Sequence, residues 1–248
     1  MKKIIFIILL VCSLYLFFRF TLHKEKLSIN NYQLITTYSS PTVSWNDITY
    51  AYEYFEVKDL SKLTLIANFT AKKSSDEILQ KNNCTSAING GYYDTNNKPL
   101  GLFINQTLKT PAIDSALVNG YIAVTTNPTV AFDLPDNPKI AVQTGPMLLS
   151  EGKKLKLAIK NDEYARRMIA GISSKGTLIF MTIFTPETKV QGPQLGDLPD
   201  IIQQINIALP NPIISAINLD GGNASMFKNT DIYIPEVSSV GSIFCLHE

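Results

Sequence analysis

The chain has 248 residues, of which 45% are hydrophobic and 17% are charged, with a net charge of +1 at pH 7. This composition supports a folded core and excludes a disordered chain. The balance of 22 basic and 21 acidic residues lacks the basic excess typical of nucleic-acid binding. The two histidines, His23 and His247, lie outside any interior motif, which argues against a histidine metal centre or a Ser-His-Asp triad. We therefore expect chemistry based on carboxylates, amides, arginine and hydroxyls.

The N-terminus has the features of an export signal. Two lysines follow Met1, and an almost wholly apolar run then extends over residues 4–18. No Ala-x-Ala pattern follows, so we predict an uncleaved signal anchor over residues 1–22, with residues 4–22 in the membrane. Lipidation at Cys12 is a minor alternative. In either case we expect the remaining chain on the periplasmic, extracellular or lumenal side.

The remaining chain divides into a tether and one domain. Residues 23–47 are polar and irregular and predict the tether, whereas residues 48–248 predict a single catalytic-type domain. The expected fold class is α/β in the α+β sense, with a mainly β-sheet core and a few helices. Strands are predicted by short runs rich in β-branched and aromatic residues, at 48–54, 62–69, 99–105, 116–125, 129–134 and 139–143.

Two helices and one hairpin are also predicted. Ser74 precedes a short helix that ends near residue 82. Residues 165–172 and 177–184 flank a polar turn and predict two antiparallel strands. Residues 195–207 carry apolar side chains at spacings of three and four, which predicts an amphipathic helix with Pro199 in its first turn or at a kink.

Polar residues and glycines gather where strands are expected to end. An apolar run that begins at Ile213 stops at Asp220, which Gly221 and Gly222 follow. Glycines at such a place let the backbone take a positive φ and let a ligand approach closely, so a binding loop is one interpretation. A hairpin turn is the alternative, because Asp-Gly is a strong turn signal. Cys84 and Cys245 can form a disulfide, but sequence separation does not decide whether they meet.

Four stretches in order resemble the phosphodiester glycosidase family. They are Asn89-Gly90-Gly91-Tyr92-Tyr93-Asp94, then Gln143-Thr144-Gly145-Pro146, then Arg167 with Gly171, and finally Leu219-Asp220-Gly221-Gly222-Asn223-Ala224-Ser225. The resemblance covers roughly residues 62–245. Asn223 and Ala224 stand where the family has Gly and Ser, and Asn223 is able to adopt the left-handed conformation of a glycine.

The resemblance implies hydrolysis of a sugar-1-phosphodiester, of the N-acetylglucosamine-1-phosphodiester type. Such a site needs a carboxylate beside the sugar and positive charge or N–H donors beside the phosphate. Asp220 is the candidate nucleophile, base or cation stabiliser, Asp94 the second carboxylate, and Arg167 the phosphate ligand. The predicted substrate-binding residues are Asn89, Gly90, Gln143, Gly145, Gly221, Gly222 and Ser225.

Other functions remain open from the sequence. Arg167 is equally suited to pair with a structural carboxylate, and Asn89 to serve as a turn residue. No cofactor is required, although Asp94 and Asp220 with amide oxygens suit a divalent cation. The alternatives to a glycosidase are a non-catalytic module that binds carbohydrate or cell envelope, and a metal-dependent phosphodiesterase.

Overall fold

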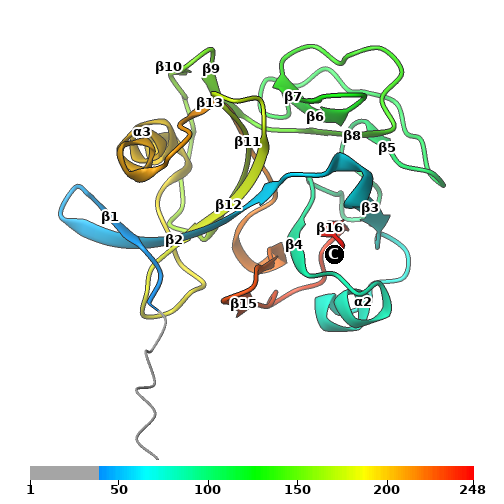
Figure 1. The fold of residues 1–248 in the computed structure, drawn as a ribbon, viewed down its shortest axis with the longest axis horizontal. Coiled ribbons are helices and arrows are strands. Elements are labelled where there is room, and N and C mark those ends of the chain that lie inside the picture. Colours follow the sequence, from blue (N-terminus) through cyan, green and yellow to red (C-terminus); the bar gives the residue numbers. More distant parts are fainter. Residues whose placement is uncertain (1–38) are drawn as a thin grey trace, which may run out of the picture. The chain divides into compact units, whose positions relative to one another are not determined.

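Three β-sheets dominate the part of the chain that the computed structural model describes, residues 39–248 (Figure 1). The predicted signal anchor lies outside these residues, as does residue 12. Among residues 39–248, no helix is both long and apolar enough to cross a membrane. The described structure is mostly β, with the two α-helices α2 (Ser75–Lys81) and α3 (Leu198–Ala208), which agrees with the predicted mainly β core.

The largest sheet has seven strands and holds the hairpin predicted from the sequence. Its strands lie in the order β1 (Thr42–Trp45), β2 (Ile48–Val57), β12 (Leu178–Phe184), β11 (Arg167–Ser173), β13 (Ile213–Asn218), β9 (Met147–Ser150) and β10 (Lys153–Lys154). The pairing of β11 with β12 is antiparallel, with Arg167 opposite Ile183. The predicted hairpin is therefore confirmed.

Two smaller sheets complete the fold. One has the order β15 (Tyr233–Ile234), β14 (Phe227–Lys228), β4 (Ser86–Asn89), β16 (Ser242–Leu246) and β3 (Leu63–Ala67). The other has the order β5 (Phe103–Ile104), β8 (Ile140–Thr144), β6 (Gly120–Val124) and β7 (Pro128–Ala131). Three single-turn 3-10 helices lie at η1 (Leu60–Lys62), η2 (Leu195–Asp197) and η3 (Gly222–Ala224).

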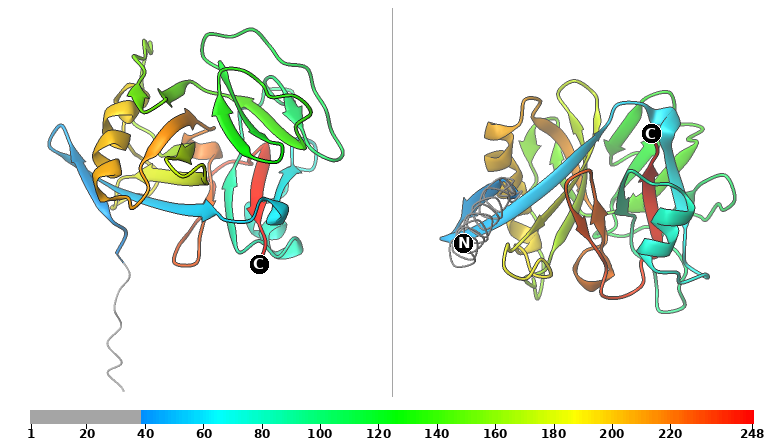
Figure 2. Two further views of the ribbon diagram at one scale, coloured as in Figure 1. Left: turned by 45° about the horizontal axis from the view of Figure 1, so that its top comes forward. Right: turned by 60° about the horizontal axis from the view of Figure 1, so that its bottom comes forward.

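Helix α3 covers one face of the seven-stranded sheet (Figures 1 and 2). Its buried Leu198, Ile201, Ile202 and Ile205 pack with Ile169 and other apolar side chains of the sheet. Burial of each such side chain contributes about 1.5–3 kcal/mol to folding. Its proline lies in the first turn, where no hydrogen-bond donor is lost, so that part of the prediction is confirmed.

The opposite face of that sheet packs against both smaller sheets. Phe180 of β12 contacts Phe244 of β16 with ring centroids 4.9 Å apart. Phe103 of β5 and Val142 of β8 belong to the same apolar cluster. The central strands β11 and β12 are thus buried on both sides, which explains their nearly continuous apolar sequence.

The sheet begins before the position that the sequence predicted. Strand β1 starts at Thr42, within the stretch predicted as a tether, and pairs with β2. Asn46 and Asp47 form the turn between them with φ of 49° and 63°. Asn and Asp tolerate this left-handed conformation better than most residues, so a polar pair forms a tight hairpin turn here.

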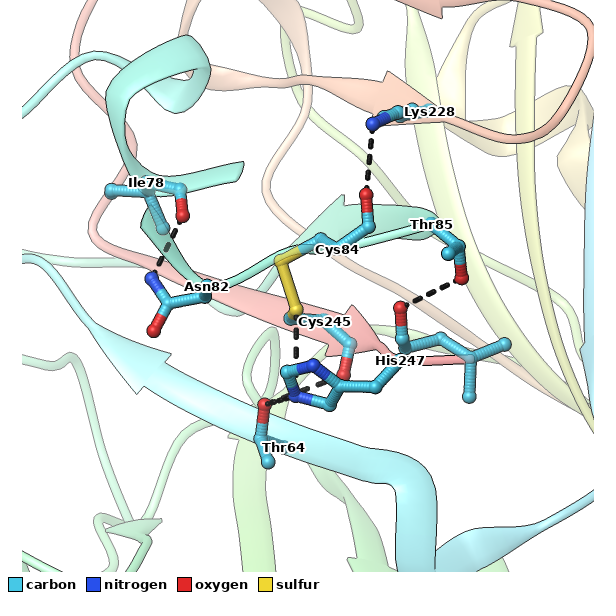
Figure 3. The surroundings of a disulfide bond; sticks show 9 residues. Thr64, Ile78, Asn82, Cys84, Thr85, Lys228, Cys245 and His247 are labelled. Atoms are coloured by element: carbon cyan, nitrogen blue, oxygen red, sulfur yellow. Dashed lines mark hydrogen bonds between the residues drawn. A yellow bond between two sulfur atoms is a disulfide. The ribbon is translucent and has the colours of Figure 1, made fainter. Parts of the chain in front are cut away.

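Cys84 and Cys245 form a disulfide across 161 residues of sequence (Figure 3). Cys84 precedes β4, and Cys245 lies in the neighbouring strand β16. The Lys228 Nζ donates to the Cys84 carbonyl at 2.8 Å, which ties β14 to the same region. The disulfide that the sequence alone did not decide is therefore present in the structure.

Candidate functional site

The two Gly-Gly segments meet in the structure, although they end strands of different sheets. The Asp220 backbone N–H donates to the Gly90 carbonyl at 3.2 Å. The Asn89 side-chain Nδ2 donates to the Asp220 carbonyl at 2.7 Å, and its Oδ1 accepts from the Met226 N–H at 3.0 Å. Asn89 is buried, so its amide joins the two segments from within rather than facing a ligand.

The segment after β13 is a loop between sheets and not a hairpin turn. Strand β13 ends at Asn218, and the chain passes through η3 into β14 of the five-stranded sheet. A Cβ at Gly221 would lie 2.8 Å from the Arg166 carbonyl oxygen, so this position requires glycine. The left-handed residue is Gly222, with φ of 63°; Asn223 lies in η3 without a positive φ, contrary to the expectation for it.

Asp220 follows the end of β13 and is partly buried. Burial raises the pKa of Asp220 to about 7, and a hydrogen bond from the Gly221 backbone offsets this only in part. The residue still retains partial solvent exposure. A carboxylate that titrates near neutral pH and can be reached from solvent is suited to exchange a proton with water.

Arg167 occupies the position opposite Asp220 on the adjacent strand. Ile169 pairs with Asn218, and the Leu219 N–H donates to the Met168 carbonyl at 2.8 Å, which places Arg167 across from Asp220. Residues directly opposite each other on antiparallel strands point to the same face of a sheet. Both side chains therefore lie on the face that α3 covers farther along.

The guanidinium of Arg167 is held by the chain that leads into α3. Its Nε donates to the Pro193 carbonyl at 2.8 Å, and its Nη2 donates to the Glu163 carbonyl. The same Nη2 lies 3.4 Å from the Asp162 carboxylate. Within the described residues its Nη1 makes no hydrogen bond, and the side chain is 11% exposed.

The Asp162 carboxylate also fixes the entry to α3. Its Oδ1 accepts from the Leu195 N–H at 2.8 Å and its Oδ2 from the Gly196 N–H at 2.7 Å. Burial lowers the pKa of Arg167, while Asp162 acts in the opposite direction. Arg167 thus pairs with a structural carboxylate, which was one of the two interpretations of this residue from the sequence. Its Nη1 remains available for a ligand.

Arg166 points to the other face, as the strand alternation predicts. Its Nε donates to the Ser225 Oγ at 2.8 Å, and its other nitrogens donate to the carbonyls of Lys189, Ser225 and Pro235. Burial lowers the pKa of Arg166 to about 10. Ser225 is fully buried and donates to the Gly222 carbonyl at 2.5 Å. Its hydroxyl therefore stabilises the loop, and the substrate contact predicted for it stays a prediction.

Tyr92 links the two charged residues electrostatically. Burial raises its pKa, the Asp220 charge raises it further, and the Arg167 charge lowers it. The Tyr92 hydroxyl donates to the Gly145 carbonyl at 3.0 Å and accepts from the Asn218 Nδ2 at 2.6 Å. The sequence assigned no role to Tyr92 or Asn218, because nothing in either local pattern indicates that the two segments meet.

Gln143 is a structural residue, which corrects its predicted role in substrate binding. Its Oε1 accepts from the N–H groups of Leu102 and Ile113, and its Nε2 donates to the carbonyls of Ile113 and Val118. The amide thus makes four hydrogen bonds, the full number for this side chain. The neighbouring Gly145 is buried, and a Cβ there would lie 2.2 Å from the Leu117 carbonyl.

Asp94 lies in a turn. Its Oδ1 accepts from the N–H groups of Asn96 and Lys98 at 2.9 and 2.8 Å. The hydrogen bond from Lys98 is the main reason why the pKa of Asp94 is lowered. No electrostatic interaction joins the two carboxylates within the described chain. The pairing of Asp94 with Asp220 therefore stays a prediction.

Metal-ligating residues do not cluster at this site in the described structure. Across residues 39–248, no three His, Cys, Asp or Glu side chains lie together in positions that could hold a metal ion. Gly221 and Gly222 are partly exposed beside Asp220, whereas Gly90 is buried and its carbonyl accepts from the Asp220 N–H. The partly exposed groups described here are thus the Asp220 carboxylate and the backbone of two glycines, and the nearly buried Arg167 guanidinium lies beside them.

A family model for phosphodiester glycosidases matches residues 82–241, which is more than half of the chain. The chain belongs to the phosphodiester glycosidase family. The matched range contains both Gly-Gly segments and the side chains of Tyr92, Arg167 and Asp220. A comparison with curated protein sequences found no match.

Solved structures support the fold of this phosphodiester glycosidase domain. The catalytic domain of zebrafish N-acetylglucosamine-1-phosphodiester alpha-N-acetylglucosaminidase, auto-inhibited by its pro-peptide, has a TM-score of 0.64 and 16% identity. That match covers 84% of this chain and 81% of the zebrafish chain. A hypothetical protein from Synechocystis also has a TM-score of 0.64, with 13% identity, over 83% of this chain and 61% of that one. At these identities the matches show the fold alone.

Proposed function

We propose that the protein is a hydrolase that cleaves the C1–O bond of a sugar-1-phosphodiester and releases free sugar and a phosphomonoester. The N-acetylglucosamine-1-phosphodiester named for the zebrafish relative is the first substrate to test. The observation that carries the proposal is the placement of Arg167 opposite Asp220 without an ion pair between them. A positive and a negative group on one face of the sheet suit the two charges of this reaction.

Arg167 binds the phosphate in this proposal. The charge-assisted N–H groups of a guanidinium match phosphate oxygens, and its Nη1 carries two of them. The contacts from Nε and Nη2 to Pro193, Glu163 and Asp162 hold the group in place before substrate arrives. A fixed positive group costs no reorganisation when charge develops on the departing phosphate.

Asp220 serves the sugar side in its ionised form. As the C1–O bond breaks, its electron pair passes to the phosphate oxygen and the sugar gains oxocarbenium character. The carboxylate stabilises that positive charge and accepts a proton from the attacking water, whose oxygen bonds to C1. The backbones of Gly221 and Gly222 lie beside it and allow the sugar ring to approach closely.

One carboxylate is sufficient for this reaction. A glycosidase that expels an alcohol needs a second carboxylic acid to protonate the leaving oxygen. A phosphomonoester, whose second pKa is about 6, leaves as a stable anion without that proton. The position of Asp94 in a separate turn is therefore compatible with the proposed chemistry.

The location outside the cytoplasm stays a proposal. The Cys84–Cys245 disulfide supports it, because disulfides persist mainly in oxidising compartments. The basis for a membrane anchor is the sequence of residues 1–22 alone. Fractionation of cells that express the full chain, followed by extraction with salt or detergent, tests whether these residues anchor the protein.

Hydrolysis in oxygen-18 water tests the proposed reaction. The full chain is incubated with an N-acetylglucosamine-1-phosphate alkyl diester, and both products are analysed by mass spectrometry. Label in the sugar is the expected result, because water then attacks C1. Label in the phosphomonoester would indicate P–O cleavage and favour a phosphodiesterase. Sugar binding without turnover across several sugar-1-phosphodiesters would favour a binding module.

A further inference from the structure

A hollow lies against helix α2 and the strands β14 and β15 of the five-stranded sheet. It has a volume of about 270 Å³, and its lining includes Asp76, Leu79, Gln80, Cys84, Lys228 and Tyr233. None of these residues belongs to the proposed active site. Pockets for drug-sized ligands have volumes of about 300–1,000 Å³, so this hollow suits a smaller ligand, of about the size of an amino acid.

Helix α2 contributes a carboxylate to the hollow. Asp76, Leu79 and Gln80 are three and four residues apart, so their side chains share one face of the helix. The Gln80 Nε2 donates to the Asp76 Oδ2 at 2.8 Å. The Asp76 Oδ1 accepts no hydrogen bond within the described residues. This side of the hollow therefore offers a negative group beside the buried Leu79.

The sheet contributes an ammonium group. Lys228 of β14 pairs with Tyr233 of β15 across two antiparallel strands, so both side chains point to the same face. The partly buried Lys228 donates from its Nζ to the Cys84 carbonyl at 2.8 Å (Figure 3). In the part of the chain that the structure describes, it forms no ion pair. An ammonium has three N–H donors, so two of them remain available for a ligand.

The Tyr233 ring is held in place by its hydroxyl. The Ser75 Oγ donates to the Glu236 carboxylate, which accepts hydrogen bonds. The Ser75 Oγ therefore accepts from the Tyr233 hydroxyl, at 2.7 Å. Tyr233 is nevertheless 37% exposed, so its ring is accessible at the hollow. Because the ring is already ordered, a ligand that packs on it loses little binding free energy to the ordering of this side chain.

The two charges of the hollow favour a ligand that carries both signs. Asp76 and Lys228 both line it, yet they form no ion pair with each other. A simple anion would be repelled by Asp76, and a simple cation would be repelled by Lys228. A neutral sugar would leave both charges without a counter-charge. A zwitterion gives each of them an opposite partner.

We propose that this hollow is a binding site for a small zwitterion of the amino-acid class. Its carboxylate accepts from the Lys228 ammonium, and its ammonium donates to the Asp76 carboxylate. Its hydrocarbon part packs against Leu79 and the Tyr233 ring. The inference does not rest on the proposed function, because binding here involves no residue of the proposed active site.

Titration calorimetry of the full chain tests this site. The ligands are the common α-amino acids, β-alanine and γ-aminobutyrate, which vary the side chain and the spacing of the two charges. Saturable binding of at least one of them is the expected result. The N-acetyl and carboxamide forms of that ligand each lack one charge and should bind at least about tenfold more weakly. No saturable binding across the panel, or equal affinity for either neutralised form, would overturn the proposal.

The variant Asp76→Asn locates the ligand on α2. It removes the charge but keeps an oxygen that accepts from Gln80, and it should weaken binding by at least about tenfold. Glu77→Gln is the matched control, because it removes the same charge from the next residue of the helix, which does not line the hollow. Wild-type affinity in Asp76→Asn, or an equal loss in Glu77→Gln, would overturn the assignment.

The variant Lys228→Gln tests the other charge. It should also weaken binding by at least about tenfold, whereas Lys81→Gln, outside the hollow, should bind as the wild type does. Wild-type affinity in a folded Lys228→Gln would overturn the site. Thermal unfolding shows whether this variant folds after the loss of its hydrogen bond to Cys84. If it does not fold, the comparison of Asp76→Asn with Glu77→Gln decides the question.

Discussion

Continuation of the β11–β13 register past Asn218 puts Arg167 across from Asp220, yet Arg167 makes its ion pair with Asp162. Opposite charges at facing positions of two strands ordinarily attract each other. Here the Pro193 and Glu163 carbonyls and the Asp162 carboxylate hold the guanidinium, and no cationic side chain among residues 39–248 forms an ion pair with Asp220. The two charges therefore form no ion pair with each other, which the proposed binding of a ligand between them requires.

The stability of the protein should depend on the ionisation of Asp220. Its pKa in the folded state is about 7, above the ordinary value of 3.8, so folding favours the protonated form. This stability is fully present below pH 3.8 and is lost as the pH rises through 7. Asp220→Asn should therefore increase the free energy of unfolding by about 1–3 kcal/mol more at pH 8 than at pH 5.

Urea denaturation at the two pH values measures this effect. Asp94→Asn is the matched control, because the pKa of Asp94 is lowered and its ionised form accepts two backbone hydrogen bonds. That variant should show no gain at pH 8. An Asp220→Asn gain that is the same at pH 5 and pH 8 would contradict the elevated pKa.

The rate of hydrolysis should increase with pH as Asp220 becomes ionised. The proposed role requires ionised Asp220, and kcat/KM reports groups of the free enzyme. We expect log(kcat/KM) to rise with a slope of one below about pH 7 and to level off above it. A rate that falls through this range would instead assign Asp220 as a general acid.

The phosphate role of Arg167 predicts that lysine is a poor substitute. A lysine ammonium provides a point charge without the planar fork of a guanidinium. Arg167→Lys should cost about 2–4 kcal/mol of transition-state stabilisation, which is the loss expected when a fixed donor to developing charge is removed. The loss is measured as a decrease in kcat/KM. Circular dichroism and thermal unfolding verify that the variant is folded. A kcat/KM within about threefold of wild type would contradict the role.

Tyr92 and Tyr93 offer a matched pair of hydroxyls. The Tyr92 hydroxyl donates to the Gly145 carbonyl at 3.0 Å, and that of Tyr93 to the Ser239 carbonyl at 2.6 Å. Replacement of either by Phe should cost about 0.5–1.5 kcal/mol of stability. Tyr92→Phe should cost more than Tyr93→Phe, because only the Tyr92 hydroxyl also accepts a hydrogen bond from the Asn218 Nδ2, at 2.6 Å. Equal losses of stability in urea denaturation would contradict this difference.

The sequence predicts those parts of the fold that depend on local periodicity. The spacing of Leu198, Ile201, Ile202 and Ile205 predicted α3, and two apolar runs around a polar turn predicted the pairing of β11 with β12. The order of sheets was not predictable, because strand partners such as β4 and β16 are far apart in the chain. The Asp220 loop joins two sheets, although its Asp-Gly-Gly sequence is equally typical of a hairpin.

The sequence predicted the charged residues of the site, but not the roles of the polar side chains around them. Arg166 and Arg167 have different partners, Ser225 and Pro193, as the alternation of side chains along a strand requires. The interpretation of Gln143 as a ligand residue was wrong because its amide bonds to segments 25 to 41 residues away. Asp94 gave the same local signal as Asp220, a carboxylate near a Gly-Gly pair, and only the tertiary structure separates them.

The most direct test of the central claim is the release of free N-acetylglucosamine from its 1-phosphate alkyl diester. The wild-type full chain is compared with Asp220→Asn, Arg167→Ala and Asp94→Asn at pH 8, after each variant has been shown to be folded. We predict release by the wild type and by Asp94→Asn, with a loss of at least about a hundredfold in the other two variants. Wild-type activity that survives in Asp220→Asn, or that is lost instead in Asp94→Asn, would contradict the proposed site.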